Sequence, residues 1–121
     1  MPRFEELSAE AFAAAVAATP RPFLVDVRTA AEYESGHVPG AKWIHVHEIA
    51  ARRAELPVSK IARVLVVGDG GKRAQAAAAW FVLMGHADVA VLSGGFESWT
   101  GAVEKGPPPP PKPRGPELRV I

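Results

Sequence analysis

Short apolar runs and longer segments of helical periodicity alternate along the chain. The apolar runs predict buried strands at residues 23–27, 43–46, 64–67 and 88–92. The other segments predict helices at residues 8–18, 29–36, 48–56 and 72–84, with a further helix beginning at 96–99. Apolar strands separated by helices are typical of a mainly parallel sheet that is buried on both faces. The pattern therefore predicts a three-layer α/β domain with helices on both sides of a central sheet.

Local signals mark the ends of several predicted helices. Ser8 stands where its hydroxyl can cap the first helix, and Pro20 follows that helix. Thr29 and Glu32 have the spacing of a capping box. Gly85 is placed to end the 72–84 helix in a left-handed conformation. These residues fix the expected boundaries more closely than the hydrophobic pattern does.

The 121 residues allow a single domain, which we expect over residues 1–105. Residues 106–121 are expected to form a separate proline-rich tail, extended or disordered, because seven of the twelve prolines lie there. Its charged residues sum to +2, against −1 for the body. A stiff, solvated extension is the expected role, and a ligand for an aromatic-lined groove is the alternative.

The charge balance narrows the classes of partner. The formal net charge is only +1, which argues against nucleic acid or a membrane surface as the main partner. No apolar run approaches the roughly 20 residues of a membrane span. The chain contains no cysteine, so disulfides and thiolate zinc sites are excluded. We expect a cytoplasmic protein.

A glycine-rich loop after the 64–67 run is the candidate site. In a parallel sheet, ligands bind at the carboxyl ends of strands, where residues 26–28, 68–73 and 93–95 should meet. Glycines at 68, 70 and 71 let backbone N–H groups curl inward, and a helix begins directly afterwards. The predicted anion-binding loop consists of Gly68, Asp69, Gly70, Gly71, Lys72 and Arg73. Its spacing matches neither a Walker loop nor Gly-x-Gly-x-x-Gly.

Four sequence blocks together resemble the rhodanese homology domain, the fold of thiosulfate and related sulfurtransferases. The resemblance covers residues 5–103 and implies a three-layer α/β fold. The blocks are Leu24-Val-Asp-Val-Arg28 with Glu32-Tyr33, Gly36-His-Val-Pro-Gly-Ala41, the strand-loop-helix Val64 to Ala79, and Leu92-Ser-Gly-Gly-Phe-Glu-Ser-Trp99.

The loop departs from the family pattern at its nucleophile. Aligning Gly71-Lys72-Arg73-Ala74 with the family's Gly-x-Arg-Ser ending places Gly68 where the reactive cysteine belongs, and Ala74 replaces the serine. Since no other side chain carries a persulfide, we assign no catalytic residue of the family's type. If the backbone N–H groups of this loop still point inward, Gly68→Cys should create a thiol with a lowered pKa.

Other polar residues have structural and functional interpretations. Asp69 is a candidate nucleophile by adjacency alone, and the competing role is to accept hydrogen bonds from amides at the helix start. Arg73 can bind an oxyanion or pair with a neighbouring carboxylate. The resemblance makes Asp26, Arg28 and His37 residues that support the loops.

Two further histidines raise the question of a metal. His45 and His47 would share one face of a strand and could supply half of a metal site. Nothing obvious in the sequence completes it, so we expect neither a metal nor a cofactor.

Three functions follow from these patterns. The favoured one is a non-catalytic module, or pseudoenzyme, that binds a protein partner or a small oxyanion such as sulfate, phosphate or a thiosulfate-like ion. The alternative is an enzyme of the sulfurtransferase or phosphatase-like type that uses Asp69, water or an external thiol at the same loop. A third possibility places partner recruitment in the proline-rich tail.

Overall fold

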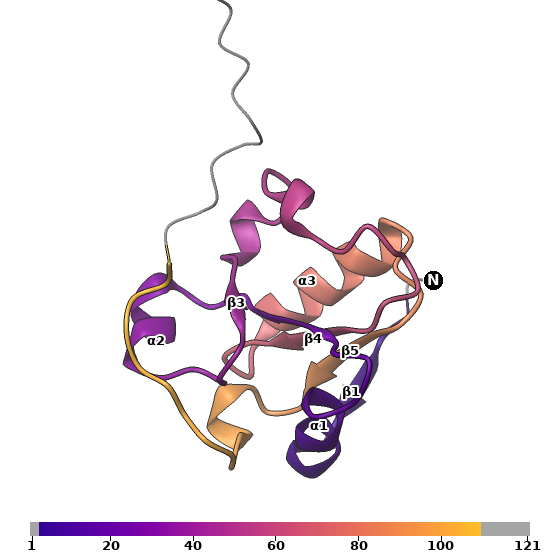
Figure 1. Ribbon diagram of the computed structural model, residues 1–121. Coiled ribbons are helices and arrows are strands. Elements are labelled where there is room, and N and C mark those ends of the chain that lie inside the picture. The colour runs from indigo at the N-terminus through magenta and orange to yellow at the C-terminus, as the bar shows by residue number, and fades with distance from the viewer. Residues whose placement is uncertain (1–2, 110–121) are drawn as a thin grey trace, which may run out of the picture.

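The computed structural model describes residues 3–109. The strands in this range form one five-stranded parallel sheet. The strands are ordered β1-β5-β4-β2-β3 across the sheet (Figure 1). Their bounds are β1 Glu5–Leu7, β2 Phe23–Asp26, β3 Lys42–Trp43, β4 Val64–Val67 and β5 Val89–Leu92. All four residues of β4 and of β5 are buried, as expected for strands covered on both faces.

The helices begin and end near the positions that the local signals predict. They are α1 Ala9–Val16, α2 Ala30–Ser35 and α3 Lys72–Leu83. The Ser8 hydroxyl accepts a hydrogen bond from the backbone of the first turn of α1. Thr29 and Glu32 form the predicted capping box on α2. Gly85 follows α3 with a φ of +99°, the left-handed conformation that glycine favours.

Side chains from alternate strand positions pack into two layers. Val64 and Val66 of β4 belong to the cluster beneath α3 and the 44–56 segment. Leu65 and Val67 point the other way, into the cluster that holds Phe12 of α1 and Tyr33 of α2. Figure 1 shows α3 on one side of the sheet and α1 on the other. The predicted three-layer α/β architecture is confirmed.

The structure differs from the prediction in two ways over residues 43–56. The strand predicted at 43–46 is present as β3 but is shorter and begins one residue earlier, at Lys42–Trp43. The helix predicted at 48–56 is wrong: the segment has two 3-10 turns, at Val46–Glu48 and Arg53–Glu55. Glu55 forms ion pairs with Arg52 and with Lys42 of β3. Three aliphatic side chains of the segment, Ile44, Ile49 and Leu56, are buried in the core.

The two ends of the domain also differ from expectation. β1 was not predicted, because a three-residue edge strand containing Glu5 and Glu6 has no apolar signature and forms only by pairing with β5. The predicted last helix is a single 3-10 turn, Phe96–Ser98, after which Trp99 is extended.

The last described residues run beside α2. The backbone N–H of Gly106 donates to the carbonyl of Glu34 at 2.9 Å. Most of the proline-rich tail predicted for 106–121 lies outside the described residues. Within residues 3–109, no helix has the length and hydropathy needed to cross a membrane.

Candidate functional site

Loops from three parallel strands meet at the carboxyl edge of the sheet, as the topology requires. The carbonyl of Gly68, directly after β4, accepts a hydrogen bond from Phe96 N at 2.8 Å. A Cβ on Gly95 would overlap the amide nitrogen of Gly70, and one on Gly70 would lie 2.8 Å from the carbonyl oxygen of Gly94. Both glycines also have positive φ. Gly70 and Gly95 therefore let the turn after β5 pack backbone against backbone on the 68–71 loop.

Gly68 has no room for a side chain. The residue is buried, and a Cβ built on it would lie 2.5 Å from the Cβ of Ala74 in the first turn of α3. The same Cβ would lie 3.2 Å from the backbone nitrogen of Ala74 and 3.3 Å from its Cα. The Ala74 methyl thus fills the space that a side chain at residue 68 needs. In this geometry the loop and the first turn of α3 leave no space at residue 68 for the family's cysteine.

Asp69 turns toward the loop and is held there. Its Oδ1 accepts the backbone N–H of Gly71 at 2.9 Å, and its Oδ2 forms a short ion pair with Arg73. The hydrogen bond from Arg73, followed by that from the Gly71 amide, lowers the pKa of the Asp69 carboxyl. Asp69 is therefore an ionised group that accepts hydrogen bonds at the start of α3.

Arg73 links this loop to α2. Besides Asp69, its guanidinium contacts the carboxylate of Glu32 at 3.0 Å. Burial raises the pKa of Glu32, but hydrogen bonds from Thr29 and Arg73 outweigh it and lower the pKa overall. Of the two roles left open by the sequence, the structure shows the pairing of Arg73 with neighbouring carboxylates. Lys72, in contrast, is exposed beside the loop.

A buried ion pair supports the loops from below. Asp26 and Arg28 are joined by several hydrogen bonds, the shortest being 2.7 Å from Arg28 Nη2 to Asp26 Oδ2. The same Nη2 donates to the carbonyl of Gly36 at the end of α2. The guanidinium also stacks 4.4 Å from the ring centroid of Phe96. Together these contacts connect β2, α2 and the 94–98 turn.

His37 orders the chain after α2. Its Nδ1 lies 2.7 Å from the carbonyl oxygen of Tyr33, and the two rings stack with centroids 3.7 Å apart. Its backbone forms a two-way bridge with Glu104. These contacts are those of a residue that holds a turn in place.

His45 and His47 lie close together, although not on a strand. His45 precedes a 3-10 turn, its Nδ1 accepts the N–H of His47 at 3.2 Å, and the ring centroids are 5.0 Å apart. Within the described part of the chain, no group of three or more His, Asp or Glu side chains is arranged to hold a metal ion. The Nδ1 of His45 is engaged in capping the turn.

Sequence reasoning missed one member of the loop site. Glu32 was assigned only to the capping box, and its ion pair with Arg73 spans 41 positions of the chain. Its place in a matched family block, beside Tyr33, was the available signal.

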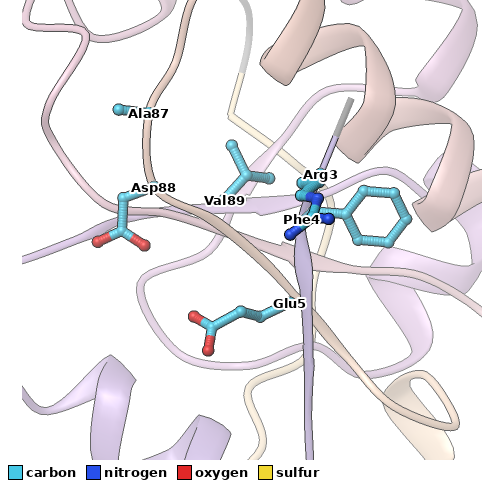
Figure 2. A pocket seen from close by; sticks show the side chains of 6 residues that line it. All are labelled: Arg3, Phe4, Glu5, Ala87, Asp88 and Val89. Atoms are coloured by element: carbon cyan, nitrogen blue, oxygen red, sulfur yellow. The ribbon is translucent and has the colours of Figure 1, made fainter. Parts of the chain in front are cut away.

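A hollow of about 520 Å³ lies at the opposite edge of the sheet, where β1 and β5 begin (Figure 2). Glu5 and Asp88 line it, and both carboxylates pair with Arg63, at 3.3 and 3.5 Å. The hollow contains none of the predicted site residues.

The fold and the strand-loop-helix site define a three-layer α/β domain of the rhodanese-like class. The Rhodanese-like domain family matches residues 8–102, and the chain belongs to this family. Thiosulfate sulfurtransferase GlpE of Pseudomonas savastanoi pv. phaseolicola is 40% identical over 76 residues, which cover 63% of this chain and 70% of that protein.

Two crystal structures show the same fold. A rhodanese-like domain protein from Staphylococcus aureus superposes with a TM-score of 0.74 at 22% identity, covering 84% of this chain and 98% of that one. A thiosulfate sulfurtransferase from Pseudomonas aeruginosa gives a TM-score of 0.76 at 23% identity, covering 85% and 20% respectively. The family resemblance inferred from the sequence blocks is confirmed.

Proposed function

We propose that this chain is a non-catalytic rhodanese-like module that binds a partner's anionic group at the 68–73 loop. The observation that carries the proposal is at residue 68, where glycine replaces a nucleophile and Ala74 fills the space beside it. A chain without cysteine has no thiolate with which to form a persulfide. What remains is a loop of amides, a helix N-terminus and two cationic side chains.

Asp69 determines how this loop binds. Its carboxylate already accepts the Gly71 amide and pairs with Arg73, so it occupies the position of a bound oxyanion. Glu32 neutralises Arg73 further. A sulfate, a phosphate or a carboxylate of a partner protein must therefore displace Asp69 from Arg73. The exchange makes binding of free oxyanions weak and favours a partner that adds contacts around the loop.

The proposal is tested by titrating sulfate and thiosulfate into the protein and into Asp69→Asn, followed by amide NMR shifts. The variant keeps the size of the side chain and removes the charge that competes with the ligand. We expect shifts at residues 70–73 and at least about tenfold tighter binding in the variant, about 1.4 kcal/mol. Asp88→Asn, at the other edge of the sheet, should leave the affinity unchanged. Unchanged or weaker binding in Asp69→Asn would contradict the displacement model.

Sequence similarity supports a second candidate function, that of a sulfurtransferase or phosphatase-like enzyme in which Asp69, water or an external thiol is the nucleophile. The supporting observation is the 40% identity to a protein named thiosulfate sulfurtransferase. If catalysis takes place at this loop, turnover should fall in Asp69→Ala, in Arg73→Ala or in both. Turnover that survives both substitutions comes from another site or another protein.

A further inference from the structure

A hydrophobic patch lies on the side of the domain where α3 ends. Residues 3–109 contain five large hydrophobic side chains that are strongly exposed, and four of them belong to the 58–61 segment and to the end of α3, which the hydrogen bond from Ala87 N to the carbonyl of Lys60 brings together. Val58 and Ile61 are 96% and 82% exposed, and Leu83 and Met84 at the end of α3 are 66% and 46% exposed. Exposed apolar side chains that gather on neighbouring segments of a small domain are typical of interaction sites. We call these four residues the α3-end patch.

A small hollow joins the two segments of the α3-end patch. It has a volume of about 130 Å³, and Leu56, Pro57, Trp80 and Met84 form its apolar lining. This volume is close to the roughly 150 Å³ that accommodates a benzene-sized group. The backbone holds the hollow in shape, because Ala87 N donates to the carbonyl of Lys60 at 2.8 Å. The surface therefore offers a formed socket for one apolar side chain.

Two cations stand at the same hollow without carboxylate partners. Arg53 and Lys60 line it, and neither forms an ion pair with a carboxylate of the described residues. Their neighbours Lys42 and Arg52 both pair with Glu55. The Lys60 ammonium lies 3.4 Å from Nε2 of His86. The positive charge at the hollow is thus left for an outside anion.

We propose that the α3-end patch and its hollow bind a partner protein through an apolar side chain flanked by acidic residues. The hollow accepts the apolar side chain, and Arg53 and Lys60 pair with the acidic flanks. A basic segment, including the proline-rich tail of this chain with its charge of +2, is repelled. The concave socket and the small number of cations favour a peptide segment over a flat anionic membrane. This surface is separate from the 68–73 loop.

The test uses short synthetic peptides and the folded protein labelled for NMR. Each peptide carries one central Leu, Phe, Trp or Ala between flanks of either Glu or Lys. We expect saturable shifts of the Trp80 indole and Met84 methyl with Glu-flanked Leu, Phe or Trp peptides. The Ala and Lys-flanked peptides should bind at least about tenfold more weakly.

Variants test whether the peptides bind at the α3-end patch and not elsewhere on the domain. Arg53→Glu with Lys60→Glu should weaken the Glu-flanked peptides at least about tenfold, and Leu83→Ser should weaken them as well. Val103→Ser removes the fifth exposed hydrophobic side chain and is the matched control. Arg21→Glu is the charge control, because Arg21 is exposed elsewhere. Both controls should bind as the parent does.

Four results would overturn the proposal. These are the absence of saturable shifts with every peptide, equal binding of Lys-flanked peptides, binding that persists in the double charge reversal, and shifts that map outside the patch. Concentration-dependent dimerisation through the patch assigns it to a second copy instead. Binding to anionic vesicles without peptide binding assigns it to a membrane.

Discussion

The contact between Gly68 and Ala74 makes a strong prediction about restoring the family's nucleophile. Gly68→Cys introduces a Cβ 2.5 Å from the Ala74 Cβ, so the loop and the first turn of α3 must separate by roughly an ångström. Overpacking of this kind costs about 1–3 kcal/mol. In a domain of this size, each kcal/mol lowers Tm by about 4–8 °C. We therefore expect Gly68→Cys to unfold at clearly lower temperature and lower urea concentration than the parent.

Ala74→Gly is the second substitution, because it removes the methyl group that a side chain at residue 68 would overlap. Alone, it removes a buried methyl and lowers helix propensity, at a combined cost of about 1–2 kcal/mol. In the Gly68→Cys background it also removes the shortest contact, that with the Ala74 Cβ. The double variant should be more stable than the sum of the two single changes by at least about 1 kcal/mol. Urea unfolding followed by tryptophan fluorescence measures all four proteins.

The same variants also test whether the backbone N–H groups of the 68–73 loop stabilise a thiolate, because the introduced thiol is the single one in a chain without cysteine. In Gly68→Cys/Ala74→Gly the thiolate lies near the N-terminus of α3, and its pKa should fall below the ordinary value of about 8.5. The pH dependence of alkylation measures it. If Gly68→Cys is as stable as the parent and the two substitutions are additive, there is room at residue 68 and the steric reasoning is refuted.

Three further predictions concern stability. Arg28→Leu leaves Asp26 buried without its partner and should cost about 3–5 kcal/mol in urea unfolding; a loss below about 1 kcal/mol would argue against the loop-supporting role. Burial, then the charge of Lys60, lowers the pKa of His86 below 6.5, so unfolding free energy should fall as pH drops below that value, and His86→Gln should remove that slope. The hydrogen bond from Arg52 lowers the pKa of Glu55 to about 2. The contribution of Glu55 to the free energy of unfolding is therefore complete above pH 4.5 and is lost as the pH falls toward 2, and Glu55→Gln should cost about 1–2 kcal/mol at pH 7. A midpoint near 4.5 in an NMR titration of the Glu55 carboxyl would contradict this.

The parts of the fold that could be predicted are those with local physical causes. Capping by Ser8 and Thr29 depends on side chains within three residues of their partners. The apolar run at 64–67 is buried on both faces, and its composition shows this directly. The loop after it could be located because a strand that ends in glycines and then begins a helix has few alternatives.

The parts that could not be predicted depend on distant partners. β1 exists because its backbone pairs with β5, more than eighty residues away. Residues 48–56 have helical periodicity, yet Glu55 is drawn to Lys42 and the segment turns instead. The closure of residue 68 by Ala74 was also missed, because spacing alone gives no distance between a loop and the helix that follows it.

The most direct test of the central claim is a sulfane-sulfur transfer assay on the unmodified chain, with thiosulfate as donor and cyanide as acceptor. A thiosulfate sulfurtransferase run in parallel provides the positive control. We predict thiocyanate formation no faster than in the protein-free mixture, and no sulfur bound to the protein by intact mass. Thiocyanate produced in proportion to this protein, and lost in Arg73→Ala, would contradict the account.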